Sequence, residues 1–194
     1  MSRLNVEMKN MKRTLILEKA AEMFEVEGFG EMKVSLLAKE VGVSVGSIYA
    51  YFDSKEGLYS AWVSSEINTA YTLFSQLFEE EMSFEEMLKT SIRIKFALFS
   101  KKRKTLKSGV LNNPFFFEAQ QLEHKEALEK LYGLFIEPIE KIKSVDIDAM
   151  QLVYILNSVG NTYVIRWIEG DIESLEDKVD EMHALFMNIL QGQR

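Results

Sequence analysis

SLLAKEVGVSVGSIYAYF, residues 35–52, is the stretch of this chain that decides its fold. Its first half predicts a short helix that buries Leu37 and Ala38, and the small Ala38 lets a second helix cross close above it. Gly42 ends this helix, because glycine reaches the positive φ of a tight turn at little steric cost.

The second half of the stretch predicts another short helix. Ser44 can cap its first turn, and Ile48 and Phe52, four residues apart, point inward. Two short helices joined by a tight turn form a helix-turn-helix, whose second helix can enter the major groove of DNA. The residues left for the sides and outer face of this second helix are Val45, Ser47, Tyr49, Ala50 and Tyr51.

Residues 42–55, GVSVGSIYAYFDSK, resemble the signature of the tetracycline-repressor (TetR) family of transcriptional regulators. Upstream, ILEKAAEMF at 16–24 and EGF at 27–29 resemble the family's first helix and the glycine that closes it. The resemblance covers roughly residues 14–58. It implies a dimer of all-helical subunits, each with an N-terminal DNA-binding head and a C-terminal body that binds a small inducer.

The head departs from the family pattern at two places. Lys33 and Leu36 stand where the family commonly has a Thr cap and an acidic residue, so the capping box is absent. Either Ser35 caps a helix that starts later, or Lys33 reaches a phosphate. Val45 takes a position that is often Lys, so the operator sequence does not follow from the resemblance.

Composition favours an all-α protein. With two prolines and ten glycines in 194 residues, the chain has few of the turn residues that hairpins need. We expect about nine helices: a three-helix helix-turn-helix head at 1–54 and an antiparallel helical bundle for ligand binding and dimerisation at 55–194. The chain has no cysteine, no long apolar run and no secretory start, so we expect a cytoplasmic protein without membrane contact.

The net charge of −7 is unevenly distributed along the chain. Residues 1–60 hold eight basic and nine acidic residues, so most of the negative charge lies further on. Cations at the ends of the head, Arg3, Lys9, Lys12 and Arg13 among them, can anchor phosphates if they cluster. The run at 101–104 is interpreted as a solvated helix end far from the head.

Several residues of the head are expected to contact DNA. The resemblance gives Tyr49 and Lys55 a phosphate contact and places Tyr51 near the backbone or a base edge, although a buried Tyr is usually a core residue. Ser47 is the best candidate for a polar contact from the second helix. The full set is Lys33, Ser35, Ser44, Val45, Gly46, Ser47, Tyr49, Tyr51 and Lys55.

Energetics favour two heads per operator. The outer face of the second helix has no Arg, Asn or Gln for a bidentate base contact, which would discriminate by about 1–3 kcal/mol. A specific regulator needs roughly 4–10 kcal/mol over non-specific binding. We therefore expect a homodimer with heads about 34–36 Å apart, or a multiple of that distance, on a palindromic site in double-stranded DNA.

The last two helices are the expected dimer contact. Residues between 175 and 189 follow a four-three rhythm typical of helix packing, and residues 150–168 are apolar on nearly every side. The same pattern also fits a bundle within one subunit. The predicted interface residues are Val153, Gly160, Val164, Leu175, Val179, Met182, Phe186 and Ile189.

A pocket for an apolar or aromatic inducer is expected in the body, although most aromatic residues at helical spacing are core. Asn157 and Asn161 lie one turn apart on an otherwise apolar helix, where they line the pocket or bridge the dimer. The candidate pocket residues are Phe96, Phe99, Phe116, His124, Tyr132, Phe135, Tyr154, Asn157 and Asn161.

The sequence does not predict an enzyme, a metal site or a cofactor. The two histidines, His124 and His183, fit no metal or triad spacing, and no phosphate-binding glycine loop is present. We expect a repressor that an inducer releases from its operator, with the fourth helix carrying the motion. The alternative is an all-helical dimeric adaptor that binds a protein partner.

Overall fold

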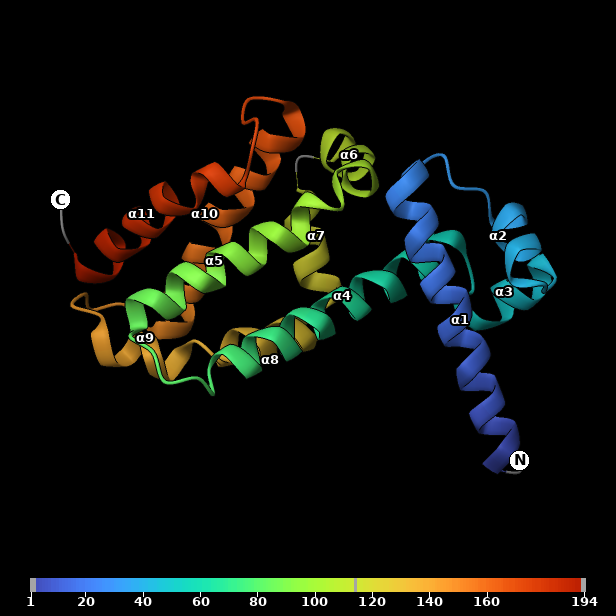
Figure 1. The fold of residues 1–194 in the computed structure, drawn as a ribbon, viewed down its shortest axis with the longest axis horizontal. Helices are drawn as coiled ribbons and strands as arrows, with labels where there is room; N and C mark the ends of the chain where they lie inside the picture. Colours follow the sequence, from blue (N-terminus) through green and yellow to red (C-terminus); the bar gives the residue numbers. More distant parts are fainter. Residues whose placement is uncertain (1–2, 114, 193–194) are drawn as a thin grey trace. The chain divides into compact units, whose positions relative to one another are not determined.

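The computed structural model describes residues 3–113 and 115–192, with side chains from residue 5 onward. In this part of the chain the regular structure is entirely helical, as predicted (Figure 1). It has eleven α-helices where about nine were expected, because residues 103–142 divide into four short helices. The helices are α1 (Arg3–Glu27), α2 (Val34–Val41), α3 (Val45–Phe52), α4 (Lys55–Leu77), α5 (Phe84–Ser100), α6 (Arg103–Asn112), α7 (Phe116–Glu123), α8 (Lys125–Gly133), α9 (Ile136–Ile142), α10 (Ala149–Glu169) and α11 (Val179–Gln191), and a 3₁₀ turn (Glu176–Lys178) precedes α11.

The chain forms two compact units. The head unit contains residues 1–66 and 102–109, and the body unit contains residues 67–101 and 110–194. The first unit thus extends twelve residues past the expected boundary at 54 and takes in the start of α6. It does so because Leu58 and Trp62 of α4 belong to the hydrophobic core of the head.

The core of the head unit lies beneath the helix-turn-helix. Ile16, Ala20 and Phe24 of α1 are fully buried there, together with Leu37 of α2 and Ile48 of α3. A cluster of four aromatic rings extends this core, with centroids 4.6–5.8 Å apart: Phe24, Phe29, Tyr59 and Trp62.

The first turns of α6 close the C-terminal end of α1. The Thr105 hydroxyl, 1% exposed, donates to the carbonyl of Phe24 at 2.8 Å, and Lys104 Nζ donates to the carbonyl of Val26 at 3.1 Å. Lys102 is buried and pairs with Glu66 at 2.7 Å. The interpretation of residues 101–104 as a solvated helix end far from the head is therefore wrong for Lys102 and Lys104, which are contacts within the head unit.

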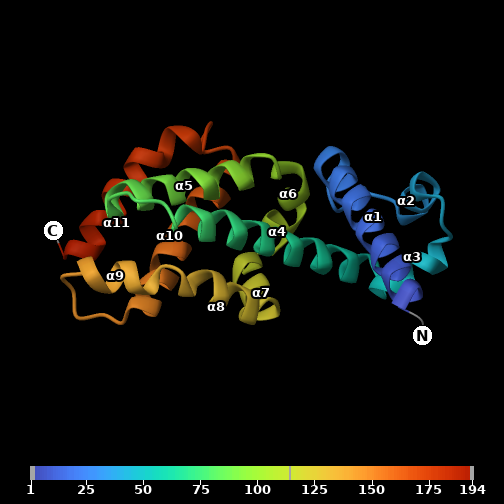
Figure 2. The ribbon, with the colours of Figure 1, turned by 60° about the horizontal axis from the view of Figure 1, so that its bottom comes forward.

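The body unit is a helical bundle in which α11 packs along α5 (Figures 1 and 2). The predicted start of α5 is confirmed, because Ser83 and Glu86 form a complete capping box. Leu88, Ile92 and Phe96 of α5 are buried in the core, and α10 and α11 contribute Leu152, Val164, Met182 and Leu190. No helix in the described residues is long and apolar enough to cross a membrane.

Candidate nucleic-acid interface and ligand-binding body

Helix α2 begins at Val34, after Lys33, whose side chain makes no capping hydrogen bond. The expected absence of a capping box is confirmed, and the alternative start with Ser35 as cap is wrong because Ser35 already lies within the helix. At the other end, Gly42 has φ 74° and ψ 34°, the left-handed conformation predicted for the turn.

Helix α3 is capped and anchored as predicted. The Ser44 hydroxyl accepts from the Ser47 backbone N–H at 3.1 Å. Ile48 and Phe52 are buried, at 0% and 4% exposure, whereas Tyr49 is exposed. The outer face of α3 is therefore open and uncharged, and it consists of Gly46, Tyr49 and Ala50 with the half-buried Val45 and Ser47 at its sides.

The junction between α3 and α4 is a tight turn that the sequence analysis did not predict. The Ser54 N–H donates to the Phe52 carbonyl at 2.7 Å across Asp53, whose φ of 63° and ψ of −45° are those of a γ-turn. A Cβ on Gly57 would lie 1.9 Å from the same carbonyl oxygen, so only glycine fits there. The signal in the sequence is a glycine in the first turn of a helix, three residues after its Ser54 cap.

Cations of the head gather beside α3. The Arg13 guanidinium lies 5.1 Å from the centre of the Phe52 ring, and Lys9 Nζ lies 6.0 Å from that of Tyr51. Lys55 Nζ donates to the Gly30 carbonyl at 3.0 Å, which leaves its other N–H groups for a further acceptor. The predicted phosphate contacts stay predictions, and the side chain of Arg3 lies outside the described residues.

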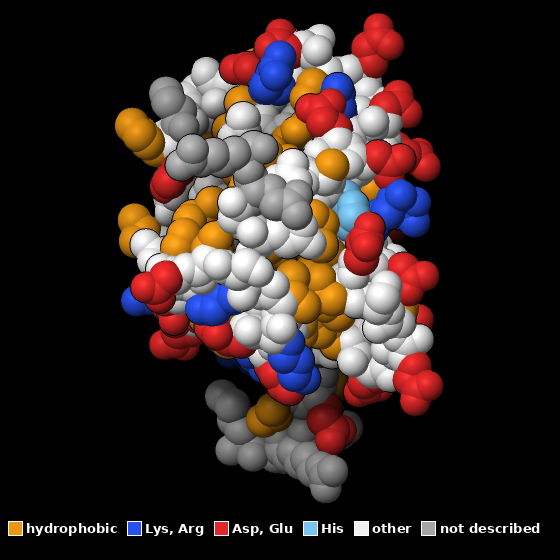
Figure 3. All heavy atoms as spheres, turned by 90° about the vertical axis from the view of Figure 1, so that its left-hand side faces the viewer, with side chains coloured by type: hydrophobic (Ala, Val, Ile, Leu, Met, Phe, Trp, Pro, Cys, Tyr) orange, Lys and Arg blue, Asp and Glu red, His pale blue; other side chains and the backbone are white. Residues whose placement is uncertain are grey.

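The division into units also separates the charge. The head unit holds twelve basic and ten acidic residues, a net +2, because residues 102–109 contribute four lysines and arginines. The body unit holds eleven basic and twenty acidic residues, a net −9. Figure 3 shows one face on which apolar side chains come to the surface among Asp and Glu. The net positive charge that can attract DNA phosphates therefore lies in the head unit, not in the body unit.

In the body unit the two predicted asparagines converge on a lysine that the sequence analysis missed. Lys95 Nζ of α5 lies 2.8 Å from Asn157 Oδ1 and 3.0 Å from Asn161 Oδ1. Burial lowers the pKa of Lys95 from 10.5 to about 7. The signal in the sequence was a lysine between Ile92 and Phe99, in the apolar row of α5.

Tyr132 and Tyr154 continue this polar cluster. Their rings meet edge to face, with centroids 5.4 Å apart. Burial, and then the neighbouring Tyr154, raise the pKa of the Tyr132 hydroxyl, while a hydrogen bond with Asn157 lowers it. Four of the nine candidate pocket residues, Tyr132, Tyr154, Asn157 and Asn161, therefore belong to one network.

The structure places the other candidate pocket residues apart from this network or at its edge. Phe96 is a core residue, and Phe99 packs on Phe117, which also contacts Phe116. His124 is buried at the junction of α7 and α8, where burial lowers its pKa. Phe135 packs edge to face on Phe74 and Phe78 of α4.

The predicted dimer residues lie inside the body unit. Seven of the eight are buried within the chain, and only Ile189 is half-buried. The residues of the four-three rhythm thus lie on the face of α11 that packs on α5. This agrees with the alternative that the pattern reflects a helical bundle within one subunit. The buried residues are Val153, Gly160, Val164, Leu175, Val179, Met182 and Phe186.

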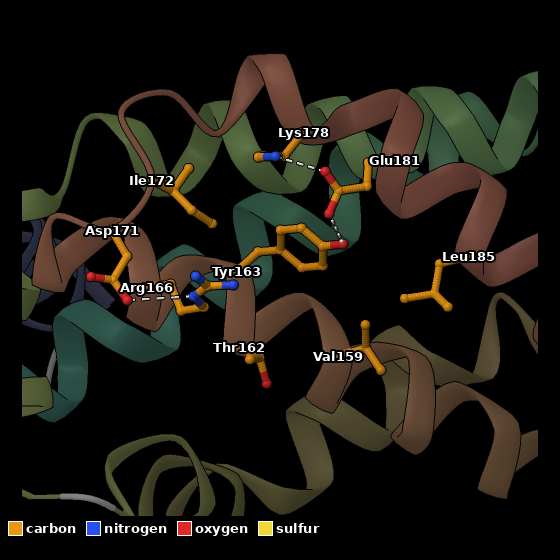
Figure 4. A pocket seen from close by; sticks show the side chains of 9 residues that line it. All are labelled: Val159, Thr162, Tyr163, Arg166, Asp171, Ile172, Lys178, Glu181 and Leu185. Atoms are coloured by element: carbon orange, nitrogen blue, oxygen red, sulfur yellow. Dashed lines mark hydrogen bonds and ion pairs between the residues drawn. The ribbon is translucent and has the colours of Figure 1, made fainter.

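The opposite side of α10 and α11 carries an open pocket of about 360 Å³ (Figure 4). The Tyr163 hydroxyl donates to Glu181 at 2.9 Å, and Lys178 pairs with the same carboxylate at 2.7 Å. Burial and the Glu181 carboxylate raise the pKa of Tyr163 to about 12. The remaining lining residues are Val159, Thr162, Arg166, Asp171, Ile172 and Leu185.

The fold and the head define a helix-turn-helix protein with a separate helical body. Residues 16–62 match the model of the tetR family of bacterial regulatory proteins. The match covers 47 of the 194 residues and shows that the head has the helix-turn-helix of this family.

Curated relatives match part of the chain. A Staphylococcus aureus HTH-type transcriptional regulator is 31% identical over 80 residues, 41% of this chain and 43% of the relative. The uncharacterized HTH-type transcriptional regulator YdgC of Bacillus subtilis is 29% identical over 120 residues, 60% of each chain. The matches thus span about half the length of these relatives.

Solved structures match nearly the whole chain. The fatty acid degradation regulator FadR from Bacillus halodurans has a TM-score of 0.71 at 22% identity, covering 92% of this chain and 99% of the other. FadR from Bacillus subtilis, in complex with stearoyl-CoA, has a TM-score of 0.70 at 20% identity with the same coverage. Thermus thermophilus FadR, in complex with lauroyl-CoA, has a TM-score of 0.70 at 19% identity, covering 92% and 94%. These likenesses show that the two units together have the fold of such regulators.

Proposed function

We propose that this chain is a DNA-binding transcriptional repressor that acts as a homodimer on a palindromic operator and is released by a small apolar ligand. The observation that carries the proposal is the helix-turn-helix itself. Buried Ile48 and Phe52 hold α3 so that an open, uncharged face with Tyr49 is presented to solvent, beside the cations of α1.

DNA binding by the head divides into two kinds of contact. Lys33, Lys55 and the hydroxyl of Tyr49 bind phosphates, which fixes the register of α3 in the major groove. Ser47 and the exposed residues of α3 contact base edges. Because this face has no side chain for a bidentate contact, one head discriminates weakly, and specificity needs two heads on two half-sites.

The homodimer forms through the exposed side of α10 and α11, not through the buried residues. Ile155 and Leu185 are both 38% exposed, large and apolar. Ile155, Val159 and Thr162 follow one another at intervals of four and three residues, and Leu185 lies with Val159 and Thr162 around the pocket of Figure 4. A second copy that covers this stripe would bury apolar surface that the monomer leaves in water.

Aspartate substitutions test this interface. Replacing Ile155 and Leu185 together with Asp should give folded monomers in light scattering, and Leu122→Asp on α7, 79% exposed, is the matched control that should remain dimeric. Aspartate at the buried Val179 or Phe186 should instead unfold the body unit. A dimer that persists in the double variant would exclude this surface.

A ligand with a long apolar part fits the body unit. The similar FadR structures of Bacillus subtilis and Thermus thermophilus are complexes with stearoyl-CoA and lauroyl-CoA, and here the rings of Phe99, Phe116 and Phe117 form a connected apolar row. A ligand that prefers one state of the body shifts the protein toward that state by its differential affinity, typically about 1–3 kcal/mol. Helix α4 carries the change, since its residues 55–66 belong to the head unit and 67–77 to the body unit.

A binding assay with duplexes from the DNA that flanks the gene of this protein tests the function. We expect one duplex to bind far more tightly than a scrambled duplex of equal length at the same salt concentration, since non-specific binding is governed by phosphates alone. Binding that depends on salt but not on sequence would refute the proposal. Binding of a protein partner without any DNA binding would support the adaptor instead.

A further inference from the structure

Lys95 is a half-buried residue in the apolar row of α5. Its neighbours along α5, Ile92 and Phe96, are 3% and 1% exposed. Its amine lies on one turn of α10, where a Cβ on Gly160 would come within 2.9 Å of Nζ. Three residues of that turn thus surround the amine: Asn157, Gly160 and Asn161, which we call the amine seat.

The partners of the amine in this seat are all neutral. Besides the two side-chain oxygens, Nζ donates to the backbone carbonyl of Asn157, at 3.3 Å. Among the described residues no carboxylate pairs with Lys95. Lys102, which is buried in the head unit, instead has the Glu66 carboxylate at 2.7 Å. A buried charge ordinarily has a partner of opposite sign, because desolvation without one is costly.

We propose that Lys95 and the amine seat bind the carboxylate of an amphipathic ligand, so that the regulator's inducer is a free acid of the fatty-acid class. The inference rests on the proposed function for its regulatory meaning. An entering carboxylate balances the ammonium charge and replaces the longest of its three hydrogen bonds, the one to the Asn157 carbonyl. Asn161 also keeps an amide NH₂ group that can donate to it.

The apolar part of such a ligand has a row of aromatic rings to follow. The Phe99 ring centre lies 5.9 Å from Lys95 Nζ, the Phe117 ring lies 6.0 Å from Phe99, and Phe116 lies 5.3 Å from Phe117. The row leads to α7 and its N-terminal flank, where Phe115 is 70% exposed. An alkyl chain along these rings would extend from the charged seat to this exposed apolar surface.

Charge distinguishes this ligand from a thioester with the same chain. A fatty acid carries its negative charge at the head of the chain, next to Lys95, whereas the carbonyl of an acyl-CoA is neutral at that position. Replacing Lys95 should therefore weaken laurate binding and leave dodecanol and lauroyl-CoA nearly unaffected.

Calorimetry on the full chain with laurate, dodecanol and lauroyl-CoA tests the proposal. We expect laurate to bind Lys95→Met at least tenfold more weakly than wild type, whereas dodecanol should bind both alike. Lys89→Met is the matched control, since Lys89 lies on the same helix but pairs with Asp180 at the surface, and it should bind laurate like wild type. Lys95→Gln keeps an N–H donor for the asparagine oxygens but removes the charge. If Lys95→Met fails to fold, laurate binding is measured with Lys95→Gln instead.

Three results would overturn the proposal: no laurate binding to wild type, equal laurate binding to the folded Lys95 variants, or an equal loss of dodecanol binding. Operator binding is measured on the same samples to separate the two conclusions. Specific operator binding without Lys95-dependent laurate binding refutes the ligand class and leaves the regulator standing. Lys95-dependent laurate binding without operator binding supports the carboxylate site and refutes the regulatory function.

Discussion

The titration of Lys95 should make the stability of the body unit depend on pH in the neutral to alkaline range. Burial lowers the pKa of this lysine from 10.5 to about 7 in the folded chain. Between these two values the unfolded chain binds a proton that the folded chain has lost. The free energy of unfolding therefore rises with pH in this window, and below pH 7 the full cost of burying the ammonium is present.

The size of the effect follows from the shift. Each pH unit between the two pKa values contributes about 1.4 kcal/mol. From pH 7 to pH 9 the free energy of unfolding should thus rise by about 2.5 kcal/mol because of Lys95 alone. Lys95→Met has no titrating group at this position and should lack the rise.

Urea denaturation of wild type and Lys95→Met between pH 6 and pH 9 measures this difference, since contributions of other groups cancel in the comparison. Lys89 lowers the pKa of Asp180, so the Lys89→Met control loses a contribution that titrates in the acid range, and its slope from pH 7 to 9 should remain that of wild type. Parallel curves for wild type and Lys95→Met would refute the buried-ammonium reasoning. Saturating laurate should flatten the wild-type slope, because an anion beside the amine favours its protonated form.

Three further substitutions test the head unit. Gly57→Ala should weaken operator binding at least tenfold in fluorescence anisotropy, because its Cβ would meet the Phe52 carbonyl at 1.9 Å and displace the end of α3. Thr105→Val should lower the free energy of unfolding by about 1 kcal/mol in urea denaturation, since it removes the buried hydrogen bond to the Phe24 carbonyl. If the Tyr49 hydroxyl binds a phosphate, Tyr49→Phe should weaken binding to the specific and the scrambled duplex alike, by about 1 kcal/mol. A loss of affinity for the specific duplex alone would indicate a base contact instead.

Local signals in the sequence predicted the head and several helix ends correctly. Gly42, Ser44 and the pair Ser83 and Glu86 act on atoms within a few residues, so the sequence pattern alone determines them. The γ-turn at Asp53 is also local, but the residues Asp53 and Ser54 are those of an ordinary helix cap. Only Gly57, in the first turn of α4, indicated the unusual geometry.

Long-range contacts were beyond the sequence pattern. Lys95 and its amine seat are more than 60 residues apart, so the asparagines were noticed without the cation they bind. The rhythm at 175–189 was read correctly as helix packing, but an apolar face does not specify whether α5 of the same chain or a second copy covers it. Seven of the eight residues are buried within the chain, which favours α5 as their partner, and the exposed stripe on the other side of α10 becomes the interface to test.

The composition of the head unit bears on how a ligand in the body can affect DNA binding. Three crossings connect the two units along the chain, at 66/67, 101/102 and 109/110, and the first and last lie within the helices α4 and α6. A continuous helix transmits a displacement that a flexible loop would absorb. The α6 crossing lies about one helical turn after Thr105, whose hydroxyl donates to the Phe24 carbonyl at the end of α1. The expectation that the fourth helix carries the motion stays a prediction. Helix α6 is a second helix that runs from one unit into the other, and the four cations of residues 102–109 give the head its net positive charge.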